Sequence, residues 1–243
     1  LLEEIESNSE RFFLSIKERF NSSQAKLVAY DALYRGSSFV SREEFTEFSK
    51  TLLKGDTTLQ GVGWIEIVPA NQRKIIEDEI RQSGYPEFTF TEITKNGLMT
   101  APSREEYYPV LYIYPYESNA NAFGLNLAGN PDRYKTLRQA FNSGQPAATP
   151  PIKLAQNTEH QRSLILYLPI FKASNNSELQ TTDTTKKLFQ GYISGVFTVE
   201  GVLGNTLSEA KQHNYGLSIT DITHPHQPEP LISSASTPFT NLP

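Results

Sequence analysis

The sequence predicts an α+β fold in which a long N-terminal helix precedes two blocks of strands and helices. Residues 1–35 contain neither Gly nor Pro, so nothing in them interrupts a helix. Short apolar or alternating segments then alternate with helical ones, and strand–helix–strand units joined by hairpins are typical of α+β sheets. The 243 residues suffice for one large domain or two small ones.

The apolar residues of the first helix form a narrow stripe. They are spaced by seven, four, four and seven positions, which keeps them on one face. They are Ile5, Phe12, Ile16, Phe20 and Leu27. The length and the narrow stripe favour a stalk that pairs as a coiled coil. The alternative is a helix that lies on its own domain.

The remaining elements follow from capping signals, Gly and Pro positions, and periodicity. Ser41 followed by Glu44 predicts a capping box that starts a helix to about residue 53. Pro131 and Gly144 bracket a helix over 131–142. Further helices are expected at 70–83 and 202–213, and strands at 61–69, 88–94, 107–115, 124–127, 147–156, 164–171, 188–200, 215–220 and 231–234. These elements divide into a stalk (1–36) and two blocks of similar plan (37–157 and 158–243).

Composition excludes several classes of function. The 22 Lys and Arg against 27 Asp and Glu give a net charge of −5, which argues against a nucleic-acid surface. The absence of Cys excludes thiolate catalysis and Cys-based metal sites. The longest apolar stretch, residues 164–171, is too short to span a bilayer. Because the chain begins within a helix, we interpret it as a piece of a longer protein whose membrane segments lie outside it.

No catalytic motif is present. There is no P-loop, no nucleophile elbow and no dinucleotide fingerprint. His224 and His226 stand in a Pro-rich loop without a carboxylate partner, so no metal and no cofactor are expected. The paired acids Glu105–Glu106 and Glu77–Glu79 leave one enzymatic alternative open, an extracytoplasmic carbohydrate hydrolase.

An ordered series of short motifs fills residues 60–172. It runs through the Trp64–Pro69 strand, Tyr108-Pro109-Val110, Gly124-Leu125-Asn126, Pro131 with Arg133, Gly144, Thr149, Lys153-Leu154 and the 166–171 strand. In order and spacing this series resembles the CHASE domain, an extracytoplasmic sensory module of transmembrane receptors.

The resemblance implies a stalk helix followed by two tandem PAS-like domains with antiparallel sheets. It also implies a periplasmic or extracellular position between two membrane helices, pairing of two copies through the stalk, and output through an intracellular histidine kinase or diguanylate cyclase. The implied partner is a small molecule of unknown identity, purine-like or cytokinin-like in the plant members, bound in the membrane-distal block at 37–157. The sensor fragment itself is expected not to be an enzyme, and no nucleic-acid partner is expected.

Candidate ligand-binding residues follow from the same resemblance. Asn126 stands where the family has an Asp, and an amide both accepts and donates hydrogen bonds. Ala148, Thr149 and Asn157 fall on the following strand. Tyr112 and Tyr114 are expected to share a face with Tyr108, by strand alternation. Trp64 either packs in the core or contacts the ligand, and Arg133 either stabilises the fold or reaches an anion. A third function, beside sensor and hydrolase, is a structural spacer with an empty pocket.

Overall fold

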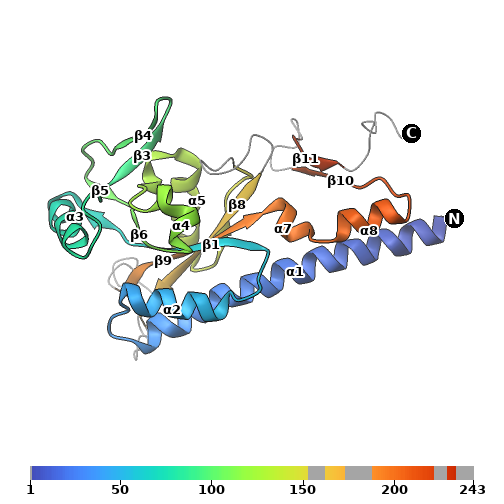
Figure 1. The fold of residues 1–243 in the computed structure, drawn as a ribbon, viewed down its shortest axis with the longest axis horizontal. Coiled ribbons are helices and arrows are strands. Elements are labelled where there is room, and N and C mark those ends of the chain that lie inside the picture. The colour runs from blue at the N-terminus through green and yellow to red at the C-terminus, as the bar shows by residue number, and fades with distance from the viewer. Residues whose placement is uncertain (1, 153–161, 173–187, 222–228, 234–243) are drawn as a thin grey trace.

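The fold is built around one antiparallel sheet with helices on both faces (Figure 1). The computed structural model describes residues 2–152, 162–172, 188–221 and 229–233. The helices are α1 (Leu2–Gly36), α2 (Arg42–Leu52), η1 (Ala70–Gln72), α3 (Arg73–Gln82), α4 (Tyr116–Asn119), η2 (Ala120–Ala122), η3 (Leu127–Gly129), α5 (Pro131–Ser143), α7 (Val199–Leu203) and α8 (Thr206–Gln212). The strands are β1 (Leu59–Ile65), β2 (Val68–Pro69), β3 (Thr91–Thr94), β4 (Gly97–Thr100), β5 (Glu106–Tyr107), β6 (Val110–Tyr114), β7 (Ala147–Ala148), β8 (Ser163–Phe171), β9 (Phe189–Thr198), β10 (Ser218–Asp221) and β11 (Glu229–Ser233).

The main sheet has the strand order β6-β1-β9-β8-β7, and all its pairs are antiparallel. β8 and β9 pair over their whole length, from Ser163 opposite Thr198 to Phe171 opposite Phe189. The division at 157 and 158 that the sequence suggests cuts through this sheet, because β8 and β9 pair with strands of the first block. A buried strand needs partners on both edges, and sequence position does not reveal which strands supply them.

The predicted long helix is present, and it lies on its own domain, which is the alternative left open above. Its C-terminal half packs on the sheet through Leu27, Tyr30 and Tyr34, all buried. Its N-terminal half lies beside α7 and α8 (Figure 1). Tyr30 and Tyr34 extend the expected apolar stripe by two residues.

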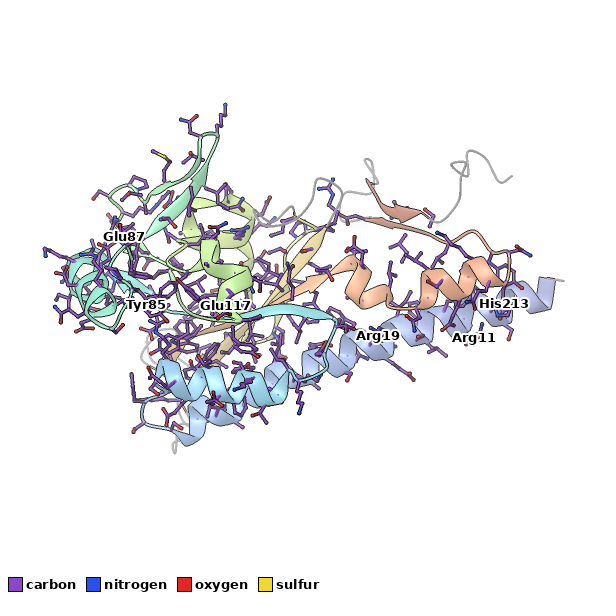
Figure 2. All side chains as sticks on the ribbon, viewed as in Figure 1. Arg11, Arg19, Tyr85, Glu87, Glu117 and His213 are labelled. Atoms are coloured by element: carbon purple, nitrogen blue, oxygen red, sulfur yellow. The ribbon has the colours of Figure 1, made fainter. Side chains whose placement is uncertain are left out.

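Polar contacts tie α1 to the loop before β1 and to α7. Arg19 donates hydrogen bonds to Thr57 Oγ1 in the loop (3.3 Å) and to the Gly201 carbonyl of α7 (3.0 Å), and Figure 2 shows it where α1 passes this loop. The Ser23 hydroxyl donates to Asp56 at 3.0 Å. Lys26 forms an ion pair with Asp56 at 2.6 Å. The helix is therefore bound to the domain by polar as well as apolar contacts.

The capping box at the start of α2 is confirmed. Ser41 Oγ accepts from the Glu44 N–H, and Glu44 Oε2 accepts from the Ser41 N–H. The next residue, Arg42, donates to the Leu111 carbonyl at 2.7 Å and lies about 5 Å from the rings of Tyr85, Tyr112 and Phe123. Such cation–π contacts fasten α2 to β6.

Only a small part of the second block (158–243) lies outside the main sheet, among the described residues. That part comprises α7, α8 and the antiparallel pair β10–β11, which lie toward the end of the molecule where α1 begins (Figure 1). Phe12 of α1 contacts Tyr215 edge to face, and Asn8 donates to the Tyr215 hydroxyl at 3.0 Å. The predicted single helix over 202–213 is divided at Gly204, whose φ is +53°.

One expectation about side-chain direction is wrong. Tyr108 does not share a face with Tyr112 and Tyr114, because the pairing of β6 with β1 is irregular between Trp64 and Ile65. An extra residue in one strand reverses the alternation beyond it. Tyr108 therefore joins the cluster under α5, while Tyr112 and Tyr114 pack against the α1–α2 side.

The buried contact of α1 with the sheet stabilises the folded domain. We expect Leu27→Ala, at a side chain only 1% exposed, to lower the free energy of unfolding by about 2–5 kcal/mol because it leaves a cavity. Val28→Ala, at the next residue and 50% exposed, should change it by no more than about 0.5 kcal/mol. Urea denaturation followed by circular dichroism measures both. Equal effects of the two changes would contradict the packing of α1 described here.

Candidate functional site

A cavity of about 50 Å³ lies between the sheet and its cover of short helices. β1, β6, β8 and β9 form its floor, and α4, η2, η3 and α5 form its roof. The side chains and backbone that line it are Gly61, Val62, Gly63, Ile93, Val110, Ile113, Asn119, Asn121, Ala122, Leu125, Leu127, Arg133, Ile165, Tyr167, Ser194 and Val196. This volume exceeds the roughly 10–15 Å³ that one water molecule requires.

Two glycines of β1 lie at the floor, where neighbouring groups pack closely against the backbone. A Cβ on Gly63 would lie 3.0 Å from Ser194 Oγ and 3.1 Å from Val110 Cγ1. A Cβ on Gly61 would lie 3.1 Å from Asn119 Nδ2. Gly within a strand often marks a place where another group approaches the backbone closely. The pattern Gly61-Val62-Gly63 was the signal in the sequence that could have located this floor.

Two polar side chains of the lining have no hydrogen-bond partner among the described residues. Arg133 on α5 is 5% exposed, and its Nε is fully buried without an acceptor. Tyr167 on β8 is fully buried, and its hydroxyl has neither donor nor acceptor. Burial raises the pKa of Tyr167 well above its usual value, so the hydroxyl keeps its proton. Buried polar groups are normally paired, so these two require an explanation.

Asn126 lies outside the cavity lining, although Leu125 and Leu127 on either side of it belong to that lining. Its side chain is 2% exposed, and both its oxygen and its nitrogen form hydrogen bonds. Oδ1 accepts from the Tyr108 N–H at 2.7 Å, and Nδ2 donates to Glu92 Oε1 at 2.6 Å. The amide thereby joins the loop before η3 to the segment that leads into β6.

Glu92 connects Asn126 to a further charged group. Arg104 donates to both carboxylate oxygens of Glu92, at 2.6 and 2.8 Å. Burial opposes ionisation of Glu92, but the hydrogen bonds from Arg104 and Asn126 outweigh it and hold its pKa below the usual value. Every member of this network is satisfied, which is typical of a structural polar cluster.

Trp64, Tyr112 and Tyr114 lie on the face of the sheet opposite the cavity. Trp64 stacks on Tyr34 of α1 with ring centroids 3.9 Å apart, and its Nε1 donates to Glu66 at 2.7 Å. Burial raises the pKa of Glu66, although this hydrogen bond favours its charged form. The structure thus shows Trp64 in the core, one of the two alternatives given above.

The other expected residues lie along the β7 edge of the sheet. Ala148 is exposed and pairs with Leu166. Thr149 is buried, and its hydroxyl accepts from the Ile165 N–H at 3.0 Å, so it joins β7 to β8. Neither belongs to the cavity lining. Asn157 lies outside the described residues.

The acidic pairs do not form a catalytic arrangement in the part of the chain described. Glu77 is buried in ion pairs with Arg73 (2.9 Å) and Arg81 (3.1 Å), and it also accepts from the Phe90 N–H. Glu106 is exposed and accepts from the Tyr108 hydroxyl. Within the same described segments, no group of three or more His, Asp or Glu side chains could hold a metal ion.

The Asn126–Glu92 contact gives a pH-dependent prediction. Asn126→Asp places a second carboxyl beside Glu92, which raises the folded-state pKa of at least one of the pair above its unfolded value. The variant is then least affected below about pH 4, and it loses stability relative to the wild type as pH rises, by about 2 kcal/mol at pH 7. Urea denaturation from pH 4 to 8 measures this, with the exposed Asn142→Asp as control. A difference that does not grow with pH would contradict the assigned contact.

Comparison with known proteins places the chain in a family. The CHASE domain model matches residues 38–232. Histidine kinase 3 of Arabidopsis thaliana is 25% identical over an alignment of 233 residues that covers 88% of this chain and 21% of that protein. The chain therefore spans about a fifth of the length of this curated relative.

A solved structure, the extracellular ligand binding receptor from Desulfohalobium retbaense DSM5692, matches 86% of this chain and 28% of its own with a TM-score of 0.49 and 14% identity. No helix among the described residues is long and apolar enough to cross a membrane. Since the family model covers most of the sequence, the protein belongs to the CHASE domain family, whose members are the sensor domains of receptors.

Proposed function

We propose that this domain senses a small molecule that binds in the cavity between the sheet and the α4–α5 cover. The observation that carries the proposal is a cavity with apolar walls into which two buried polar side chains, Arg133 and Tyr167, bring unpaired groups. Apolar walls with a few placed polar groups are the usual chemistry of small-molecule sites. Of these two residues, Arg133 also belongs to the motif series that resembles the family, whereas Tyr167 is identified by the structure alone.

The central strands offer a route from this cavity to α1. In β9, Ser194 and Val196 line the cavity, whereas Gly195 and Phe197 face α1. A Cβ on Gly195 would lie 2.5 Å from Leu27 Cδ1, so strand and helix are in close contact. A ligand that shifts β1 or β9 by a fraction of an ångström would therefore change the packing of α1 and bias a two-state equilibrium.

The two alternatives have less support. A hydrolase needs two free carboxyls at one site, but Glu77 is held by two arginines and the cavity lining contains no acidic residue. A spacer with an empty cavity gives no reason for an unpaired guanidinium in the interior, which is costly to bury.

The larger setting is also part of the proposal. We propose that the chain is the extracytoplasmic portion of a transmembrane receptor, that two copies pair through α1, and that an intracellular kinase or cyclase is the output. Phe13, Leu14 and Val28 leave apolar area exposed on α1 for such pairing. We also propose that residues 37–198 form the membrane-distal PAS-like unit, and that the segment from 199 onward forms the proximal one.

The binding site can be tested before the ligand is known. Native mass spectrometry of gently purified protein should detect a bound small molecule, and Val196→Phe should abolish it by filling the cavity. Val28→Phe, the same change at an exposed site on α1, should retain it. A compound that binds the cavity, added at 100 times its dissociation constant, should raise the free energy of unfolding by about 2.7 kcal/mol in the wild type and in Val28→Phe, but not in Val196→Phe. Equal retention by both variants would place the ligand elsewhere.

A further inference from the structure

We propose, on the basis of the sensor function just given, that the ligand is a small carboxylate whose charged group pairs with Arg133. Its apolar body would lie against the floor of the cavity. The argument rests on the charges of the lining, on the hydrogen bonds that Arg133 lacks, and on the chemistry of the walls.

The cavity lining carries one formal charge. Among the described residues of the lining, Arg133 is the one side chain that is charged at neutral pH, and none is Asp or Glu. The described lining therefore carries a positive charge, and a negatively charged ligand suits it.

Arg133 has no internal anion to satisfy it. Among the described residues its side chain forms no ion pair and no hydrogen bond, and its Nε is buried without an acceptor. The carboxylate of Glu92, in the neighbouring network, is already held by Arg104 and Asn126. Asp132, the adjacent acid, lies exposed on the first turn of α5. A guanidinium that is 5% exposed, with its Nε buried and no carboxylate beside it, is costly to retain, and an external anion that pairs with it explains its retention.

Other groups of the site define the rest of the ligand. The Tyr167 hydroxyl is unpaired and protonated, and it can donate to a carboxylate oxygen. The Ser194 hydroxyl is already used, since it donates to the Gly63 carbonyl at 3.3 Å. Apart from Asn119 and Asn121, the side chains that remain in the lining are aliphatic, chiefly Val110, Ile113, Leu125, Leu127, Ile165 and Val196. One cation and one hydroxyl suit a monoanion with a branched apolar body better than a phosphate dianion.

A matched pair of probes tests the charge of the ligand. Isovalerate and isovaleramide have nearly the same shape, but only isovalerate is an anion. We expect isovalerate to raise the unfolding midpoint in thermal denaturation and to give saturable binding by titration calorimetry. Isovaleramide, and sodium chloride at equal ionic strength, should do neither. Wild-type protein that binds neither probe, or binds both equally, would overturn the proposal.

Variants of single residues test the partners. Arg133→Met keeps the length of the side chain and removes its charge, so isovalerate affinity should fall at least about tenfold. Arg138→Met is the matched control, because Arg138 lies on the same helix and outside the cavity lining, and it should leave affinity unchanged. Tyr167→Phe should weaken binding several-fold while leaving stability unchanged, since its hydroxyl has no internal partner.

A stability measurement on the unliganded protein needs no ligand at all. If Arg133 is an unpaired cation, Arg133→Met should unfold at the same temperature as the wild type or higher. A midpoint lowered by more than about 4 °C would show that Arg133 is a structural residue and would overturn the proposal.

These experiments also distinguish failure of the carboxylate proposal from failure of the sensor proposal. If a neutral compound binds, is lost in Val196→Phe and binds Arg133→Met normally, the cavity is a ligand site but the anion assignment is wrong. If Val196→Phe retains isovalerate binding, the cavity itself is not the site, and both proposals fail.

Discussion

The packing of α1 on the back of β1 and β9 is the contact on which the rest of the structure depends. These two strands are the centre of the main sheet, and both faces of each are buried. On one face Trp64 stacks on Tyr34, and Gly195 lets Leu27 approach the strand closely. On the other face the same strands form the floor of the cavity. A strand buried on both faces cannot move on one side alone, since protein interiors are close-packed.

Buried polar side chains in and near the cavity are of two kinds. Some have hydrogen-bond partners in the described chain and hold the structure together, and others have none and are free to bind a ligand. In the network of Asn126, Glu92 and Arg104 each side chain has hydrogen-bond partners at 2.6–2.8 Å. Such a network fixes the loops around the cavity. Arg133 Nε and the Tyr167 hydroxyl are buried and have no partner in the described chain. It is this incompleteness, and not the family position of Asn126, that points toward a ligand.

Much of the fold could be predicted from the sequence because local signals and tertiary structure agree. The Ser41–Glu44 capping box, the Pro131–Gly144 helix and the uninterrupted first helix are all present. The sheet topology could not be predicted, because the pairing of β1 with β9 joins segments more than 120 residues apart. Nothing local in either strand specifies the other.

Several residues expected to bind a ligand lie beside residues of the cavity lining and not in it, and their role in binding stays a prediction. Leu125 and Leu127 line the cavity while Asn126 does not, and Ile113 lines it while Tyr112 and Tyr114 do not. Strand side chains alternate between faces, so an error of one residue exchanges cavity for core. The pairing of β6 with β1 shifts by one residue between Trp64 and Ile65, and no turn-forming residue in the sequence indicates where this shift lies.

The most direct test of the account uses the single tryptophan of the chain as a reporter. Trp64 lies on the α1 side of β1, with its ring against Tyr34, whereas the cavity lies on the other side of the same strand. If the central strands couple the two faces, titration with isovalerate changes Trp64 fluorescence with the same midpoint as calorimetric binding. Saturable binding by calorimetry without any change in Trp64 emission would contradict the coupling of cavity and helix.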